Sequence, residues 1–339
     1  MAFEIIGTGR AVPTTRVTND ELAKKIDTSD EWIRSHTGIG ARHIADDDTA
    51  CSDLALEAAR KALSMAEPGK SPEEAALSLD VIVLASASPD YLGTPSTACI
   101  VQDKLGAKRA CAMDITAGCT GFIYGLETAA GLLAMDSGKK RALVIGSEVL
   151  SKFTDWTDRG ICVLFGDGAG AVVLEKTAAP REGSNRRGLV RTVLRADGSG
   201  AEHLVIRRSG SRNPLKAGET VDKPFYIAMN GQAVYNFAVK AVTDTITDIL
   251  SIEGIGIGDV DLIIPHQANA RIVQAAAKRL KVPEEKFYLN IEEYANTSAA
   301  SIPIALDELN RAEKLKTGEL ILFVGFGGGL TYGANLVVW

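Results

Sequence analysis

The chain lacks several features that would assign it to a common class. It has no stretch of about 18 uncharged apolar residues, so we expect no membrane-spanning helix. Its 5 cysteines stand singly without a CxxC pair, which indicates neither a disulfide framework nor a metal site. The first residues form no basic, apolar leader, and we expect a cytoplasmic protein. The net charge of -6 argues against nucleic acid or a membrane surface as a partner.

What is present is an ordinary globular composition arranged in α/β order. The 339 residues are 46% hydrophobic, enough for two domains or one large pseudo-symmetric unit. Residues 80–86 form a near-continuous apolar run, which is typical of a strand covered on both faces. Such runs alternate with segments of helical spacing. This alternation predicts an α/β fold with mostly parallel strand pairing.

An internal repeat divides the chain. Residues 80–83 resemble residues 261–264, Cys119 corresponds to Ser298, and residues 144–146 correspond to residues 323–325, all at nearly the same offset. The repeat predicts two similar βαβ-type halves, residues 1–177 and 178–339, that face each other with a site where they meet. Polar stretches at 178–188 and 207–223 are expected to be a linker and an exposed loop.

One stretch in the first half carries a candidate nucleophile. In residues 114–126 a β-branched run ends in small residues, and Cys119 stands at the first turn of an apolar helical segment. A helix N-terminus stabilises an anion, so we expect the thiol to form a thiolate readily and to attack acyl groups. Gly118 and Gly121 permit a sharp bend and the close approach of a substrate. The alternative is that Cys119 is a small core residue.

Three segments of the second half add polar groups and flexible backbone. His266 ends a buried apolar strand, the position where α/β sheets hold ligands, although a lone histidine is often structural. Asn296 opens the small-residue turn that corresponds to the Cys119 turn, and by itself it reads as a helix N-cap. Residues 327–329 are three glycines after a strand. They offer either free N–H groups for an oxyanion hole or a tight turn.

These segments, in this order, resemble the β-ketoacyl-acyl carrier protein synthase III family of the thiolase superfamily. The motifs are AGCTG at 117–121, PHQAN at 265–269, NTSAAS at 296–301, FGGG at 326–329, DEWI with HTGI at 30–39, and DRG with FGDGAGA at 158–171. The resemblance covers nearly the whole chain. It implies a thiolase-like αβαβα layered structure and a homodimer.

The resemblance also implies a two-step acyl transfer. Cys119 would take an acyl group from acyl-CoA, and malonyl-acyl carrier protein would then lose CO2 and condense with it. His266 and Asn296 would stabilise the enolate by hydrogen bonds, and the backbone N–H groups of Cys119 and Gly328 would form the oxyanion hole. Hydrogen-bond donors meet the needs of an enolate, so the resemblance implies no cofactor and no metal beyond acyl-CoA as substrate.

Further residues are expected to bind the two substrates. Trp32 and Arg159 would clamp the CoA adenine, since an indole and a guanidinium can sandwich a base. Phe326 would pack against the site and exclude water. The carrier protein is acidic, and a basic helix face after His266 would bind it. The residues assigned to that contact are Gln267, Arg271, Lys278 and Arg279, with Lys281 beside them.

The sequence departs from the family pattern at a few positions. His36 stands where relatives often have Arg near the CoA phosphates, and Thr94 where some have Phe. Gln232 and Asn236 replace Asn and Lys of some relatives. The alternatives are a relative that makes a specialised polyketide or quinolone-type product with the same triad, a cysteine hydrolase, and a non-enzymatic acyl-binding protein. The glycine-rich 165–171 segment is interpreted as backbone packing, since it lacks the order of a nucleotide loop.

Overall fold

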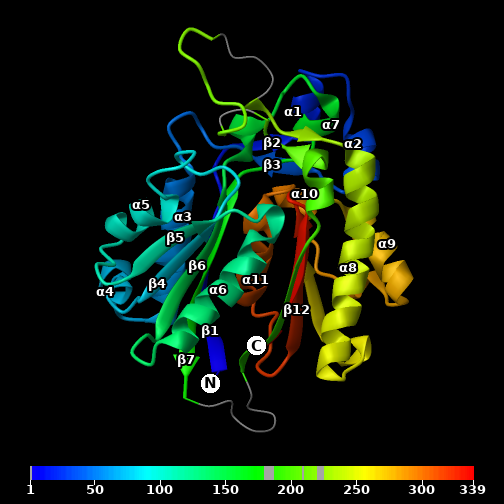
Figure 1. The fold of residues 1–339 in the computed structure, drawn as a ribbon. Helices are drawn as coiled ribbons and strands as arrows, with labels where there is room; N and C mark the ends of the chain where they lie inside the picture. Colours follow the sequence, from blue (N-terminus) through cyan, green and yellow to red (C-terminus); the bar gives the residue numbers. More distant parts are fainter. Residues whose placement is uncertain (1, 179–186, 208–209, 220–224) are drawn as a thin grey trace.

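The computed structural model describes residues 2–178, 187–207, 210–219 and 225–339. Two sheets form its framework (Figure 1). The first has five strands in the order β1-β7-β6-β4-β5, and the second has four in the order β11-β12-β13-β8. Their bounds are β1 Ala2–Ala11, β4 Val81–Ala85, β5 Cys111–Ile115, β6 Arg141–Glu148, β7 Gly168–Thr177, β8 Gly188–Ala196, β11 Leu262–Pro265, β12 Leu320–Gly327 and β13 Thr331–Val338.

The two sheets repeat one topology, as the sequence repeat predicts. In each sheet two antiparallel pairings join three strands, β1-β7-β6 and β8-β13-β12, and a parallel strand follows, β4 or β11. Strand β5 continues the first sheet as a parallel edge strand. Its counterpart in the second half shrinks to a single parallel bridge between Ile263 and Phe287. The boundary between residues 177 and 178 stays a prediction.

Helices form three layers around these sheets (Figure 1). Helices α6 and α11 lie between the sheets, where their apolar residues and the inner faces of both sheets form one core cluster. Helix α3 packs on the outer face of the first sheet, and α8 and α9 cover the second. The bounds are α3 Cys51–Ala66, α4 Pro72–Ala76, α5 Thr97–Lys104, α6 Gly121–Met135, α8 Gly231–Glu253, α9 Ala270–Leu280 and α11 Ser301–Arg311.

Short elements cap one end of the layers, the end at which β4, β6, β11 and β12 finish. They are β2 Arg16–Thr18, α1 Asn19–Ala23, α2 Asp30–Thr37, β3 Ala41–His43, α7 Arg159–Cys162, β9 Leu204–Val205, β10 Ala228–Met229 and α10 Ile291–Tyr294. Helix α2 begins after Ser29, whose hydroxyl accepts the N–H of Trp32 at 3.1 Å. This cap fixes the start of the helix that carries Trp32 and His36.

The glycine-rich segment before β7 packs closely, as the sequence predicts. A Cβ on Gly170 would lie 2.7 Å from the backbone of Ile304, so only glycine lets α11 approach β7 at that point. No helix among the described residues is long and apolar enough to cross a membrane. The predicted linker at 178–188 falls largely outside the described residues. Of the predicted loop at 207–223, residues 210–219 form no helix or strand and are mostly exposed, as expected.

Candidate active site

Cys119 lies where the two halves of the fold meet. It belongs to a single 3-10 turn, Gly118–Thr120, directly before α6, so the predicted position at a helix N-terminus is confirmed. A Cβ on Gly327 would lie 2.4 Å from the Cys119 backbone N, and one on Gly118 would lie 2.7 Å from the Gly328 backbone N. Gly118 in the cysteine turn and Gly327 at the end of β12 are therefore needed, because the two backbone segments lie directly against each other.

The corresponding turn of the second half, Ser298–Ala300, carries the groups that connect the other predicted residues to Cys119. The Ser298 side chain hydrogen-bonds to the Cys119 thiol, and the Ser298 N–H donates to Asn296 Oδ1 at 2.9 Å. Three residues later, Ser301 Oγ lies 2.8 Å from His266 Nδ1. The segment 296–301 thus brings Asn296, His266 and Cys119 into one constellation.

An apolar cavity of about 610 Å³ opens above Cys119. Ser298 and Gly328 line it together with Cys119, and the rest of its wall is largely aliphatic and aromatic. The main apolar lining residues are Leu92, Leu150, Phe165, Leu204, Ile206 and Ile227. A cavity of this kind, with a few polar groups at one end, is suited to an apolar chain carrying one reactive group.

The structure corrects the expected state of the thiol. Burial raises the pKa of Cys119 to about 12, and the nearby Glu148 carboxylate acts in the same direction. Cys119 is only 8% exposed, and this loss of hydration outweighs the helix N-terminus that we expected to lower the pKa. The Cys119 thiol is therefore protonated in the folded chain at neutral pH.

His266 is a neutral imidazole. It is 2% exposed, and burial lowers the pKa of His266 to about 3. Its ring meets the Phe326 ring edge-on at a centroid distance of 5.5 Å, so Phe326 packs against the site as expected. At neutral pH His266 can therefore act as a hydrogen-bond donor from one nitrogen while the other contacts Ser301.

Trp32 and Arg159 lie together at the capped end of the molecule. The Arg159 guanidinium carbon is 4.6 Å from the Trp32 ring centroid, and the His36 ring stacks on Trp32 with a centroid distance of 4.4 Å. Arg159 also lines a cavity of about 450 Å³ with Lys25 and Trp156. Trp32 and Arg159, which the sequence predicts to act together, are thus in contact, and they lie beside a cavity with basic residues on its wall.

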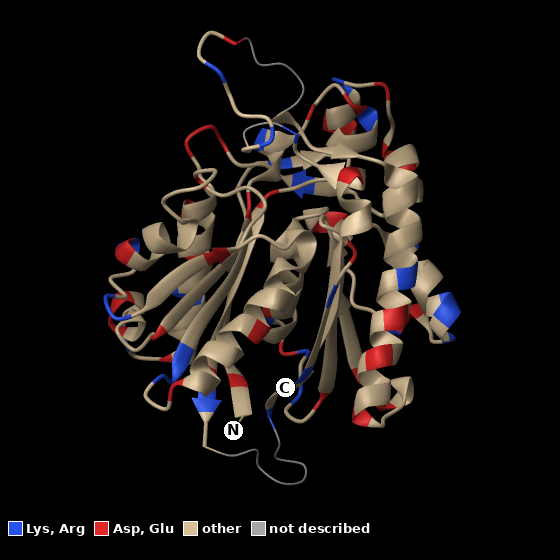
Figure 2. Ribbon diagram, viewed as in Figure 1, with Lys and Arg blue, Asp and Glu red and all other residues tan. Residues whose placement is uncertain are grey.

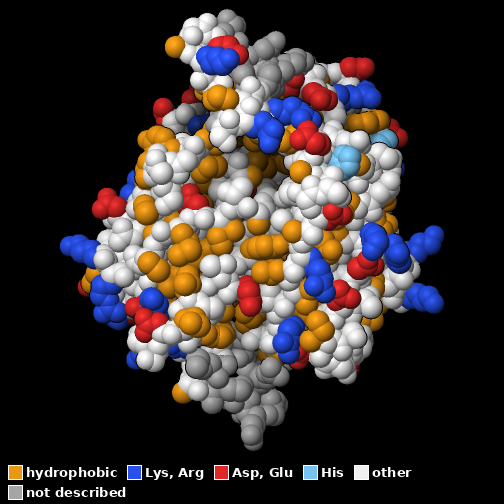
Figure 3. Space-filling view, viewed as in Figure 1, with side chains coloured by type: hydrophobic (Ala, Val, Ile, Leu, Met, Phe, Trp, Pro, Cys, Tyr) orange, Lys and Arg blue, Asp and Glu red, His pale blue; other side chains and the backbone are white. Residues whose placement is uncertain are grey.

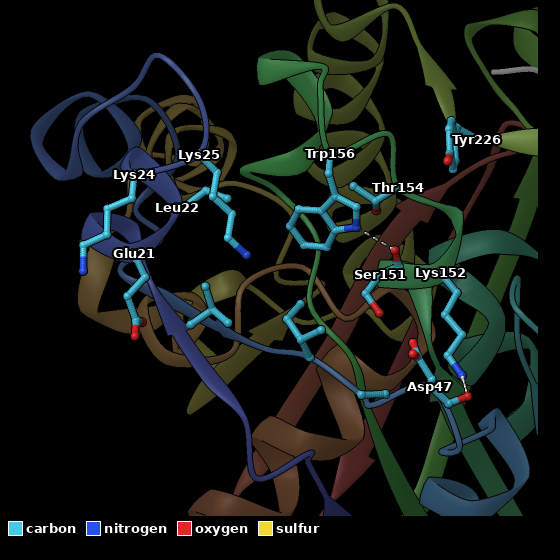
Figure 4. A pocket seen from close by; sticks show the side chains of 13 residues that line it. Glu21, Leu22, Lys24, Lys25, Asp47, Ser151, Lys152, Thr154, Trp156 and Tyr226 are labelled. Carbon is cyan, nitrogen blue, oxygen red and sulfur yellow. Dashed lines mark hydrogen bonds between the residues drawn. The ribbon is translucent and has the colours of Figure 1, made fainter. Parts of the chain in front are cut away.

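A further cavity of about 740 Å³ shares Lys25 and Trp156 with this one (Figure 4). The Trp156 indole stands over it and donates from Nε1 to the Ser151 carbonyl at 3.2 Å. Lys152 on its wall donates to the carbonyls of Asp47 and Thr49, both at 2.9 Å. None of the residues that the sequence singled out lines this cavity.

Comparisons with known proteins decide the family. The chain matches the model for 3-oxoacyl-[acyl-carrier-protein] synthase III over residues 113–205 and the model for its C-terminal part over residues 250–339. The β-ketoacyl-[acyl-carrier-protein] synthase III of Natranaerobius thermophilus is 48% identical over 336 residues, which cover 99% of this chain and 99% of that protein. The chain belongs to the β-ketoacyl-acyl carrier protein synthase III family.

Solved structures of the same family have the same fold as this chain. The 3-oxoacyl-[acyl-carrier-protein] synthase III of Aquifex aeolicus superimposes with a TM-score of 0.86 at 43% identity, covering 99% of this chain and 100% of the other. A priming β-ketosynthase from a polyketide biosynthetic pathway gives a TM-score of 0.86 at 32% identity, with coverage of 99% and 96%. The predicted thiolase-like α/β fold is confirmed, and the chain is an acyltransferase of the synthase III family.

Not every predicted synthase III contact lies where the sequence placed it. Arg271, Lys278 and Arg279 are exposed on α9 and form no ion pair with any residue in the described part of the chain. Figure 2 marks basic residues along α9, and Figure 3 shows basic side chains projecting from that edge of the molecule. The structure corrects the prediction that Gln267 contacts the carrier protein. It is 1% exposed, and its amide bonds to the backbone of Pro265, Tyr288 and Asn290, so it holds the chain after β11 and does not reach a partner.

The sequence interpretation missed three buried polar residues of the synthase III site. Ser298 contacts the thiol, Ser301 contacts the imidazole, and Glu148 contacts Ser298. Ser298 and Ser301 were visible within the NTSAAS segment but were treated as small residues of a turn. The sequence repeat could have revealed Glu148, because it stands 179 positions before Gly327, at the matching strand end.

Proposed function

We propose that this chain catalyses the decarboxylative condensation of an acyl-CoA starter with malonyl-acyl carrier protein, the step that begins fatty acid biosynthesis. The observation that carries the proposal is the contact of the Cys119 turn with the backbone of Gly327 and Gly328, at the end of an apolar cavity. This arrangement combines a nucleophile, backbone N–H donors and room for an acyl chain.

In the first step, Cys119 Sγ attacks the thioester carbonyl carbon of acyl-CoA. The oxyanion that forms accepts hydrogen bonds from the backbone N–H groups of Cys119 and Gly328, and its collapse expels CoA and leaves an acyl-cysteine. The close approach of these two backbone segments supports this assignment. The acyl chain then occupies the apolar cavity, where Phe165 and Leu204 lie.

In the second step, malonyl-acyl carrier protein loses CO2, and the resulting enolate carbon attacks the acyl-cysteine. His266 and Asn296 donate hydrogen bonds to the enolate oxygen. Two contacts support these roles: the Asn296 carbonyl oxygen is occupied by Ser298 N–H, which leaves its NH2 group as the donor, and Ser301 occupies His266 Nδ1, which leaves Nε2. Donors suffice to stabilise an enolate, so we propose no cofactor.

Two surfaces serve the substrates. Trp32 and Arg159 bind the CoA adenine, and the cavity beside them with Lys25 suits its phosphates. The exposed bases of α9, Arg271, Lys278 and Arg279, bind the acidic carrier protein.

We also infer that the enzyme is a cytoplasmic homodimer. Strand β5 is a sheet edge, and all five of its residues, Cys111–Ile115, are at least partly exposed. An open strand edge of this kind is a site for pairing with another chain. Figure 3 shows hydrophobic side chains gathered across the middle of the viewed face, over the region of α6. All five cysteines are free thiols, which fits a reducing compartment.

The experiment that tests this function measures intact mass after incubation with acetyl-, isobutyryl-, hexanoyl- and octanoyl-CoA, followed by addition of malonyl-acyl carrier protein. An acyl adduct mapped to Cys119, absent in C119A and discharged with release of CO2, supports the synthase. An adduct discharged by water without malonyl substrate would instead indicate a hydrolase. No adduct from any donor would refute acyl-CoA as the starter.

A second candidate function is the priming of a specialised polyketide pathway by the same chemistry. The cavity of about 610 Å³ is the observation that favours it, because an acetyl group would fill only a small part of that volume. One structural relative is a priming β-ketosynthase of such a pathway. The same acyl-CoA series distinguishes the two, since a polyketide primer predicts a strong preference for the longer donors.

A further inference from the structure

Glu148 ends β6 as a completely buried carboxylate behind the floor of the active-site cavity. It is 0% exposed, and no Lys, Arg or His among the described residues forms an ion pair with it. Its oxygens are held by neutral donors only. These are Ser88 Oγ at 2.6 Å, Ala87 N at 3.0 Å, Ser86 Oγ at 3.3 Å, Ala299 N at 3.5 Å, and the Ser298 hydroxyl. A buried carboxylate without a cation is costly and calls for a role.

A hydrogen-bonded path joins this carboxylate to the nucleophile. The Ser298 side chain bonds both to Glu148 and to the Cys119 thiol. In its ionised form, the form that can take up a proton, Glu148 can only accept hydrogen bonds. The Ser298 hydroxyl proton is then directed to Glu148, and the Ser298 oxygen is left to accept the Cys119 S–H. The direction of the path is therefore set: thiol to hydroxyl to carboxylate.

The pseudo-symmetry of the fold explains why a carboxylate reaches this point. Each central strand, β6 and β12, ends against the small-residue turn of the opposite half. Gly327 at the end of β12 lies against the Cys119 turn, and Glu148 at the end of β6 lies against Ser298 and Ala299. One strand end thus supplies backbone to the nucleophile, and the other supplies a proton acceptor to the turn beside it.

We propose that Glu148 stores the proton of Cys119 while the cysteine carries the acyl group; this rests on the proposed function. In the first step the S–H proton passes to Ser298, whose own hydroxyl proton passes to Glu148. The sulfur forms a bond to the acyl carbon, the C–S bond of acyl-CoA breaks, and the CoA thiolate takes a proton from water. In the second step the malonyl carboxylate leaves as CO2, its electron pair forms the new C–C bond, and the departing Cys119 thiolate regains the proton from Glu148 through Ser298.

The neighbouring titratable groups leave Glu148 as the acceptor. Burial raises the pKa of Glu148, which increases its affinity for a proton, and Cys119 faces it from the opposite half. Cys51 faces it from α3, with its Sγ 3.5 Å from Ser86 Oγ, and burial raises its pKa too, so this thiol stays protonated. His266 is bonded to Ser301 and lies outside this path.

The test counts protons during acylation alone. Enzyme and acyl-CoA are mixed near pH 7 without malonyl substrate in a weakly buffered indicator solution, while CoA release and the Cys119 adduct mass are followed. CoA leaves as a thiolate with an ordinary thiol pKa of about 8.5 and is protonated from solvent at this pH. The wild type is expected to take up one proton per CoA released. An infrared difference spectrum of the acyl-enzyme is expected to gain the C=O band of a protonated carboxyl group.

Two variants interrupt the path, and a third is the control. E148Q cannot store a proton, and S298A removes the connection without altering the carboxylate; both are expected to acylate roughly 100-fold more slowly and to take up no proton. D167N is the matched control. Asp167 is also 0% exposed, with a pKa raised by burial, but it bonds to Ala45 N and to Ser151 and not to Cys119. It should keep the proton uptake of the wild type.

The outcomes are distinct. One proton per CoA in the wild type and D167N, with none in E148Q or S298A, supports the proposal. If a path variant fails to fold, the wild-type stoichiometry and infrared band decide alone. CoA release and a Cys119 adduct without proton uptake in the wild type, or uptake that survives in E148Q, overturns the proton store. Absence of any adduct overturns the proposed function instead.

Discussion

The Ser301 hydroxyl lies 2.8 Å from His266 Nδ1 and also accepts the Gln267 backbone N–H at 3.3 Å. In the described part of the chain the Ser301 hydroxyl has no hydrogen-bond acceptor other than Nδ1, so its proton is directed to that nitrogen. The imidazole proton then sits on Nε2, where a donor for the enolate oxygen is required. A buried serine therefore selects the histidine tautomer that the second step needs.

Replacement of this serine should affect decarboxylation and spare acylation. In S301A the imidazole loses its tautomer preference, and we expect decarboxylation of malonyl substrate to slow by about 10- to 100-fold. Formation of the Cys119 adduct should change little. Single-turnover measurement of each step, with S52A as a control at another buried serine, checks this. Equal slowing of both steps would contradict a role confined to His266.

Opening of the Trp32–Arg159 pair is expected to accompany CoA binding. The guanidinium carbon lies 4.6 Å from the indole centroid, whereas a base between them requires roughly 7 Å, twice a van der Waals contact. We expect R159A and W32A to raise KM for acyl-CoA about 10-fold, consistent with the loss of one stacking contact. An acyl-pantetheine substrate without the nucleotide should show no change. A similar loss with both substrates would exclude an adenine clamp.

Charge reversal on α9 should weaken use of the carrier protein. We expect the double variant R271E/K278E to raise KM for malonyl-acyl carrier protein at least 10-fold, with a smaller effect at high salt, while acylation by acyl-CoA stays intact. Lys314 and Lys316 are exposed in the turn after α11, so K314E/K316E changes the net charge equally at another surface and is the control. Equal loss of both activities in the α9 variant would refute the docking surface.

Stability should fall on acidification because of His266. Its pKa is about 3 in the folded chain and about 6.5 unfolded, so only the unfolded chain gains this proton between those values. The free energy of unfolding should therefore be highest above pH 6.5 and fall by about 1.4 kcal/mol per pH unit below it from this group. Urea unfolding of wild type and H266Q at several values from pH 7 to 4 measures the difference. Parallel curves would contradict a neutral buried histidine.

An ion-pair cluster links α11 to β1 and should carry substantial stability. The Asp307 carboxylate is completely buried and bonds to Arg10 at 2.8 Å, Arg311 at 2.9 Å and Thr8 Oγ1 at 2.8 Å. We expect D307A to lower the free energy of unfolding by about 3 kcal/mol, because it leaves these partners without an acceptor. The exposed pair of Arg60 and Glu73 provides a control, E73Q, which should cost under about 1 kcal/mol. Similar losses in both variants would contradict this account.

Much of the fold followed from local pattern. The apolar run at 80–86, the helical spacing after Cys119 and the repeat offset predict β4, α6 and the two related sheets, because burial on both faces leaves a direct trace in sequence. The repeat also predicted that Cys119 and Ser298 belong to facing turns. What it could not give was the loss of a full strand opposite β5, where one bridge at Phe287 remains.

For the candidate site too, the sequence predicted some residues and not others. Cys119, His266 and Asn296 could be selected from residue type, spacing and resemblance, whereas the roles of Gln267 and Glu148 could not. Gln267 was predicted to lie at a surface but is buried, because its side-chain amide forms hydrogen bonds with the backbone of Pro265, Tyr288 and Asn290. In the sequence, Glu148 looks like an ordinary charged residue at the end of a strand. Its contact with Ser298 of the opposite half appears only in the tertiary structure.

The sequence by itself determined the elements, the repeat and the family, and it selected Cys119 as the proposed nucleophile, because these depend on periodicity and residue type along one chain. Only the tertiary structure decided the protonation of the site. Hydration lost on burial and hydrogen bonds formed across the two halves set the pKa of Cys119 and His266, and both depend on neighbours far away in sequence. The contacts Cys119–Ser298 and Ser298–Glu148 exist only because two halves of one chain face each other.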